Sequence, residues 1–311
     1  MYLSDVHTHS IASGHGTTCT VSDMAKAAAK KGLKLLGITD HGPGTLAAGT
    51  SSYFRSLSYS PKKRFGIELL FGVELNILDV DGHVDLNDEL LGKLDYAIAS
   101  MHAHNYKSGS VKENTSAYLN AMKHPCVKIL GHCDNPHFPV DYETLAVAAK
   151  EFGVIFEINE ASLAPYGYRG DTRANNREIL RCCRKYNIPI VLSSDSHGAE
   201  HIGDFTYAAE TYDAVILSAL AATKGGATDG KTVAKNLPAV SGTTGGEKCE
   251  SYKDCVALIK DGKEIQYVGQ SGIGPFNDDH DPGAASIGIY KFDAKNKPVF
   301  DHAQQGSVPK G

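Results

Sequence analysis

The histidines of this chain are the residues whose spacing points most directly to chemistry. His7 and His9 stand one residue apart, after the short apolar run 1–6 that could be a strand. Residues i and i+2 of a strand point to the same face, and two adjacent imidazoles have the arrangement that a divalent metal ion needs. A chance pair on a solvated edge is the alternative, so the rest of the chain must decide between the two.

Six further apolar segments have strand character, and each ends in or carries residues of the kinds that bind metals. These are 33–42 with Asp40 and His41, 67–78 with Glu74, 94–104 with His102 and His104, 127–136 with His132, 153–162 with Glu157 and Asn159, and 188–198 with Asp195 and His197. Helix-like stretches lie between the strands, for example at 21–32, 141–153 and 175–187.

This alternation of strands and helices predicts an α/β fold with a parallel sheet. In a (β/α) barrel, the carboxyl ends of all strands open onto one face, where the active site is built. Seven strands that all carry ligand-type residues at the same end are not expected by chance. The pattern therefore favours His7 and His9 as the first two ligands of a metal cluster.

Nine of these positions, taken in order, resemble the polymerase-and-histidinol-phosphatase (PHP) family of metal-dependent phosphoesterases, and its stand-alone branch in particular. They are the HxH pair His7 and His9, then His15, His41 of the DH pair, Glu74, His102, His132 of the GH pair, and Asp195 and His197 of the SDSH motif. The resemblance covers residues 1 to about 204. It implies a distorted seven-stranded (β/α) barrel that holds three divalent metal ions.

The resemblance also implies a ligand set for each ion. His7, His9, Glu74 and Asp195 would hold the first ion. Glu74, as a bridge, would hold the second with His102 and His132, while His15, His41 and His197 would hold the third. Sites rich in imidazole suit zinc, iron or manganese, whereas magnesium and calcium prefer oxygen ligands.

The reaction expected of such a site is hydrolysis of a small phosphomonoester by a metal-bound hydroxide. Clustered ions lower the pKa of bound water and hold a phosphoryl group in line for attack. One alternative is an amidohydrolase-type metallohydrolase, which also begins with HxH but relies on a lysine bridge that is not found here. The other alternative is a non-enzymatic solute-binding or fusion protein.

Residues that support the ligands are predicted less directly. Asp40 is expected to orient a ligand histidine or to act in proton transfer, with a purely structural role as the alternative. Arg173, in the loop after the sixth strand, is expected to contact the phosphate of the substrate. Arg64, His104 and Arg169 are further candidates for this contact.

Composition narrows the class of partner. The 311 residues carry a formal net charge of -5, which gives no electrostatic footprint for nucleic acid. The longest apolar run, 214–222, is too short to span a bilayer, and residues 1–20 lack the pattern of a secretory signal. We therefore expect a cytoplasmic protein that acts on a small phosphorylated metabolite, without nucleic-acid or membrane partners. The oligomeric state is not defined by the sequence.

The sequence changes character after residue 205. Residues 206–311 resemble the carboxy-terminal segment of periplasmic branched-chain amino-acid binding proteins, on the stretches AETYDAV, GKEIQYVGQSGIGPFNDDHDP and ASIGIYKFD. We therefore expect a PHP barrel over 1–205 and an α/β appendage over 206–311, joined as a chimera, with a divergent native tail as the alternative. The apolar stripe of a helix over 206–222 is expected to cover the barrel.

The same resemblance places Cys249 and Cys255 where some members of that second family could carry a local disulfide. In a cytoplasmic protein we expect these two cysteines to be mostly reduced. The other five cysteines are expected to be small buried hydrophobic residues rather than a disulfide framework.

Overall fold

The structure is a computed structural model that describes residues 3–165, 167–272, 274–277, 284–292 and 298–307. The chain forms two compact units, Met1–Ala208 and Ala209–Gly311. The predicted boundary after residue 205 therefore lies three residues before the division between these units. Among the described residues, no helix is both long and apolar enough to cross a membrane.

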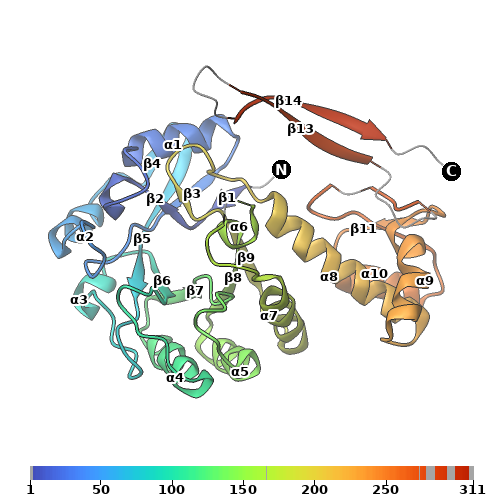
Figure 1. Cartoon of the computed structure of the whole chain (residues 1–311), viewed down its shortest axis with the longest axis horizontal. Coiled ribbons are helices and arrows are strands. Elements are labelled where there is room, and N and C mark those ends of the chain that lie inside the picture. Colours follow the sequence, from blue (N-terminus) through green and yellow to red (C-terminus); the bar gives the residue numbers. More distant parts are fainter. Residues whose placement is uncertain (1–2, 166, 273, 278–283, 293–297, 308–311) are drawn as a thin grey trace. The chain divides into compact units, whose positions relative to one another are not determined.

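Parallel strands form the centre of the first unit, and helices surround them (Figure 1). The strands are β1 (Ser4–Asp5), β2 (Thr8–His9), β3 (Leu35–Ile38), β5 (Ile67–Asn76), β6 (Tyr96–Ser100), β7 (Val127–Leu130), β8 (Ile155–Asn159), β9 (Ile190–Ser193) and β10 (Ser196–His197). The short β4 (Lys63–Arg64) adds an antiparallel partner to β5. The main sheet has the order β1-β3-β5-β6-β7-β8-β9.

The first and last segments of this sheet meet again through β2 and β10. These two strands pair in parallel, with Ser196 opposite Thr8 and His197 opposite His9. Because β2 follows β1 and β10 follows β9, this pairing bends the sheet into a nearly closed barrel. The predicted α/β barrel is thus confirmed, and the pairing places His9 beside His197, the last predicted ligand.

Helices lie on the outside of the barrel, and several of them begin at a residue whose side chain caps the helix. They are α1 (Val21–Lys30), α2 (Ser51–Leu57), α3 (Asp88–Leu91), α4 (Val111–Ala121), α5 (Tyr142–Phe152), α6 (Glu160–Leu163) and α7 (Arg173–Tyr186), with the 3-10 turn η1 (Ile11–Ser13) after β2. Thr20 and Asp23 form a capping box at the start of α1. Gly153 ends α5 with a φ of 68°, a left-handed conformation that glycine adopts without strain. Met24, Leu36 and Phe71 belong to the core that joins α1 to the sheet.

The second unit is a smaller α/β unit with its own core. Its elements are α8 (Thr206–Gly225), which begins in the first unit, α9 (Gly230–Ser241), β11 (Glu247–Cys249), α10 (Tyr252–Lys260), β12 (Ile265–Tyr267), β13 (Ala284–Phe292) and β14 (Pro298–Ser307). β11 and β12 pair in parallel, and β13 and β14 pair antiparallel. Buried Asp213 on α8 accepts hydrogen bonds from the Tyr267 hydroxyl at 2.8 Å and the Ser271 amide at 2.7 Å.

Two expectations for this region need correction. The sequence predicts that the apolar stripe of α8 covers the barrel, but Ile216 and Leu220 lie in the core of the second unit, because Val240 and Ile265 supply apolar partners there. The sequence also predicts reduced cysteines, whereas Cys249 and Cys255 form a disulfide. Their Cα atoms are 5.3 Å apart, which is within the range for such a bond. The other five cysteines are free, and Cys133, Cys182 and Cys183 are buried.

Candidate metal centre

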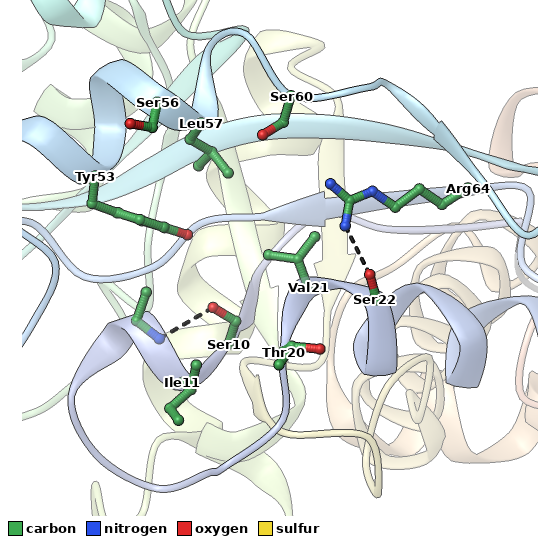
Figure 2. Close-up of a pocket in the computed structure, with 11 residues that line it drawn as sticks. Ser10, Ile11, Thr20, Val21, Ser22, Tyr53, Ser56, Leu57, Ser60 and Arg64 are labelled. Carbon is green, nitrogen blue, oxygen red and sulfur yellow. Dashed lines mark hydrogen bonds between the residues drawn. The ribbon is translucent and has the colours of Figure 1, made fainter.

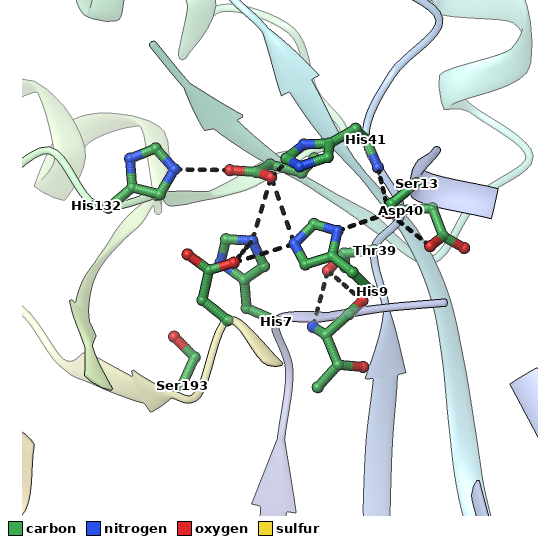
Figure 3. A network of polar contacts seen from close by, with 12 residues as sticks. His7, His9, Ser13, Thr39, Asp40, His41, His132 and Ser193 are labelled. Atoms are coloured by element: carbon green, nitrogen blue, oxygen red, sulfur yellow. Dashed lines mark hydrogen bonds and ion pairs between the residues drawn. The ribbon is translucent and has the colours of Figure 1, made fainter. Parts of the chain in front are cut away.

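The carboxyl ends of the barrel strands bring the predicted ligands of the first ion together, and Figure 3 shows two of them, His7 and His9, beside each other. His7 Nε2 and His9 Nε2 lie 3.6 and 3.2 Å from Asp195 Oδ1. The same two nitrogens lie 3.4 and 3.5 Å from Glu74 Oε2. All four side chains are almost completely buried. They therefore converge on one point from the first, third and last parts of the barrel.

Glu74 also faces the predicted ligands of the second ion, with its other oxygen. Glu74 Oε1 lies 2.8 Å from His132 Nε2 and 3.3 Å from His102 Nε2. The two oxygens of one carboxylate thus point to two different groups of imidazoles. A carboxylate that bridges two cations has this arrangement.

The third predicted group lies beside the first. The ring centroid of His15 lies 5.0 Å from those of both His41 and His197, and His15 is exposed at the edge of the cluster. The ligand atoms of His9, His41 and His197 lie within 4.8 Å of one another. The ring centroid of His9 lies 4.4 Å from that of His41 and 4.1 Å from that of His197, so His9 is closer to this pair than the predicted ligand His15.

Buried atoms without partners show that the cluster lacks something. Six of the buried side-chain nitrogen and oxygen atoms without a hydrogen-bond partner in the described part of the chain belong to it. These are Nε2 of His7, His9 and His197, Nδ1 of His41 and His132, and Oε2 of Glu74, of which His41 Nδ1 and Glu74 Oε2 face each other as an ion pair at 2.7 Å. Leaving such atoms unsatisfied costs about 1–3 kcal/mol each. Cations would supply the missing partners, and the imidazole and carboxylate donors fit zinc, manganese or iron.

The neighbours of His7 and His9 fix which ring nitrogen faces the cluster. His7 Nδ1 lies 2.6 Å from Glu157 Oε1, and a carboxylate only accepts, so Nδ1 of His7 carries the hydrogen. His9 Nδ1 lies 2.8 Å from the Ser13 hydroxyl, which itself donates to Asp40 Oδ1 at 2.7 Å. That hydroxyl must therefore accept from His9 Nδ1. Both histidines turn Nε2 toward the common centre, and this is the nitrogen that would bind a metal ion.

The role of Asp40 follows from this chain of contacts. Its carboxylate also accepts from the Ser10 amide at 2.6 Å, the Ser10 hydroxyl at 2.8 Å and the Tyr53 hydroxyl. These donors surround Asp40 and fix its carboxylate next to Ser13. The structure thus favours Asp40 as a residue that positions His9 through Ser13, which is one of the predicted alternatives.

Glu157 is a site residue for which the sequence predicts no role. It lies on β8, is buried, and bonds His7 through Oε1. Its Oε2 accepts from the His132 amide at 2.6 Å and from Asn159 Nδ2 at 3.0 Å. One carboxylate thus fixes a predicted ligand of each of two ions. Its place at the carboxyl end of a strand was the signal that could have identified it.

Electrostatics hold Glu74, His9 and His132 in the protonation states that bind cations. Burial raises the pKa of Glu74, but the nearby charges of His102, His7 and His41 outweigh this effect and hold it well below its usual range. Burial lowers the pKa of His132 to about 4, and Arg169 contributes in the same direction. Burial also lowers the pKa of His9, helped by His197 and His41. Glu74 is therefore ionised, and His9 and His132 are neutral. Burial lowers the pKa of His7 and His41, but the surrounding carboxylates outweigh it and raise both, so a bound cation would displace a proton from these two imidazoles.

Two of the predicted ligands have a left-handed backbone. Asp195 has a φ of 54° and His132 a φ of 27°, values that side chains other than glycine rarely adopt. Such strain persists only where the surrounding structure enforces it, and it is concentrated at functional sites. At both positions it aims a side chain into the barrel mouth.

The structure places Arg173, the predicted phosphate contact, at the surface. This residue starts α7 with 74% of its side chain exposed, and it forms an ion pair with Asp171 at 2.8 Å. Arg169, four residues earlier, is the arginine that reaches the cluster. It is 7% exposed, and its Nη2 donates to Asp195 Oδ2 at 2.7 Å. The acceptors that draw Arg169 inward are not evident in the sequence of the loop.

The other two candidates lie away from the ligands. His104 is exposed in the turn after β6. Arg64 lines a separate pocket of about 320 Å³ between α1 and α2, where its Nη1 donates to the Ser22 hydroxyl at 2.9 Å. Figure 2 shows Arg64 and Ser22 at one end of this pocket and Tyr53 at the other.

The barrel and its cluster of histidines and carboxylates define the class of the protein as a metal-dependent hydrolase. Comparison with known families identifies that class further. The PHP domain matches residues 5–163, and the PHP-associated region matches residues 173–223. The chain therefore belongs to the PHP domain family. The second match continues past residue 205 into α8, so similarity to the family does not end at the predicted boundary.

Relatives and solved structures agree with this assignment. A protein of Clostridium novyi named as a probable phosphatase is 40% identical over 214 residues, which are 69% of this chain and 86% of the relative. One of Clostridium botulinum strain Hall, with the same kind of name, is 41% identical over 204 residues, or 66% of this chain and 82% of that one. A histidinol phosphate phosphatase of Lactococcus lactis, solved with zinc, L-histidinol and phosphate, has the same fold. The two share a TM-score of 0.51 and 16% identity, over 69% of this chain and 94% of that one.

Proposed function

We propose that this phosphatase of the PHP family is a metal-dependent phosphoesterase that hydrolyses a small phosphomonoester at a trinuclear site. The observation that carries the proposal is the double contact of Glu74. Its Oε2 faces His7 and His9, and its Oε1 faces His102 and His132. Membership of the family and the names of the relatives support the same reaction class.

The residues present would hold three divalent ions in the predicted sets. When bound, the ions would supply Lewis acidity to the phosphoryl group and an acidified water. The protein itself orients the ligands. Glu157 holds His7, Ser13 and Asp40 hold His9, and Asn76 Oδ1 holds His102 Nδ1 at 2.7 Å. Outer contacts of this kind are typically worth 10–100-fold in metal affinity or activity.

The substrate proposed is a small phosphorylated metabolite. The protein of Lactococcus lactis is described with histidinol and phosphate, which supports a small phosphomonoester as the substrate class here. The zinc of that protein and the imidazole donors of this chain support zinc, with manganese and iron as the other candidates.

The proposal is tested by metal analysis of the purified protein together with hydrolysis of p-nitrophenyl phosphate. We expect two or three transition-metal ions per chain and turnover that a chelator removes and added metal restores. A metal-free protein, or one whose hydrolysis is unaffected by chelation, would contradict the proposal. Metal with no phosphatase activity would favour an amidohydrolase-type reaction, and neither metal nor activity would favour a binding or fusion protein.

We also propose that residues 226–311 take no part in the reaction, because every predicted ligand lies between His7 and His197 in the first unit. A chain that ends at Gly225 is expected to keep its metal content and to retain kcat/KM within about twofold. It should associate in light-scattering experiments, because Ile216 and Leu220 lose their apolar partners. Loss of metal from a monomeric truncated protein would show that the second unit contributes to the site.

A further inference from the structure

Tyr168 stands beside the predicted metal ligands without a role assigned so far. It lies in the loop between α6 and α7, next to Arg169, and 78% of the residue is exposed. Arg169 Nη2 donates to the Tyr168 hydroxyl at 3.1 Å, and the guanidinium carbon lies 4.9 Å from the centre of the tyrosine ring. A cation above an aromatic ring within about 6 Å is attracted to it, so Arg169 holds both the ring and the hydroxyl.

Arg169 also determines where that hydroxyl lies. The same nitrogen, Nη2, donates to Asp195 Oδ2 at 2.7 Å, and Nη1 donates to Ser162 Oγ at 3.2 Å and Asn159 Oδ1 at 3.3 Å. The guanidinium is therefore fixed from both sides inside the barrel mouth. The Tyr168 hydroxyl is held next to Asp195, at the edge of the cluster.

The hydrogen of this hydroxyl has no acceptor within the described part of the chain. The phenol oxygen accepts from Arg169, and no acceptor for its own hydrogen lies among the described residues. A tyrosine hydroxyl is protonated at neutral pH, and desolvation raises the pKa of Tyr168 further although Arg169 opposes the shift, so the group remains a donor. A donor that is fixed beside a phosphatase site and unused by the protein is suited to an oxygen of the substrate.

We propose that Tyr168 is a substrate-contacting residue whose hydroxyl donates a hydrogen bond to the phosphoryl group. Arg169 positions the hydroxyl, and the exposed ring forms part of the wall through which the substrate enters. This inference rests on the proposed phosphatase function. It extends that function by naming a donor that belongs to neither the metal ligands nor their outer contacts.

The test compares Tyr168→Phe with the wild-type protein, both loaded with the same metal. The substitution keeps the ring and its contact with Arg169 but removes the donor. We expect KM for p-nitrophenyl phosphate to rise about tenfold, since a hydrogen bond to a charged group is lost. The affinity for inorganic phosphate, measured by calorimetry, should fall by about the same factor while metal content is unchanged.

Tyr59→Phe is the matched control, because Tyr59 is also 78% exposed but lies after α2. It should leave both quantities within twofold. If Tyr168→Phe retains its KM and its phosphate affinity in an active protein, Tyr168 only packs against Arg169 and this inference is wrong. A metal-loaded wild-type protein that neither binds phosphate nor hydrolyses the ester would overturn the proposed function as well.

Discussion

Glu74→Gln is expected to remove nearly all hydrolysis and much of the bound metal. The substitution preserves the shape of the side chain but replaces one oxygen by an amide NH₂, which cannot bind a cation. Both oxygens are in use, because Oε2 faces His7 and His9 while Oε1 faces His102 and His132. Loss of one bridge therefore disturbs two predicted ions. We expect kcat/KM to fall by about 10³-fold or more, which corresponds to roughly 4 kcal/mol of transition-state stabilisation.

Glu68→Gln provides a matched control on the same strand, since Glu68 is exposed on β5. It should retain full activity and metal content, and Arg173→Ala should also have a small effect because Arg173 pairs with Asp171 at the surface. A Glu74→Gln protein that keeps its metals and more than about a tenth of its activity would rule out a bridging role.

Arg169→Met is expected to destabilise the metal-free protein more than a typical substitution. Arg169 is buried and bonds Asp195, and burial raises the pKa of nearby Asp134 to about 6 while Arg169 opposes that shift. Removing the guanidinium leaves the buried carboxyl groups of Asp195 and Asp134 without a nearby positive charge. Breaking one partner of a buried ion pair costs about 3–5 kcal/mol, and we expect a loss of this size in the free energy of unfolding by urea.

Arg173→Met is the comparison for stability, because its ion pair with Asp171 lies in the same loop but at the surface. Exposed pairs contribute about 0–1 kcal/mol. If the two arginine variants lose similar free energy of unfolding, Arg169 does not compensate the negative charge of the buried carboxylates. A larger loss in the metal-free than in the metal-loaded Arg169→Met protein would further link Asp195 to the metals.

Much of the barrel was predictable because each strand has an apolar run that ends in ligand-type residues. The pairing of β2 with β10 was not, since strands of two residues leave no periodic signal. The first predicted strand is in fact interrupted at Val6 and His7, between β1 and β2. This interruption lets His7 and His9 approach both Glu74 and Asp195.

Side chains that support the ligands were harder to predict. Ser13 and Glu157 contact His9 and His7 across the fold, and no spacing rule identifies such contacts. Arg169 and Arg173 lie in one loop and carry the same charge. Which one turns inward depends on acceptors from distant strands, Asn159 on β8 and Asp195 after β9. The folded geometry therefore decides what the local sequence leaves open.

Anomalous diffraction at the absorption edge of the bound metal tests the central claim most directly. If the predicted metal cluster forms, we expect anomalous-density peaks about 2.0–2.3 Å from ligand atoms that include Nε2 of His7 and His9. Glu74 should lie between two of these peaks. A rival group of possible ligands, Asp79, Asp81 and His83, lies in a surface loop. Metal found at that loop, with none between His9 and Glu74, would contradict the account.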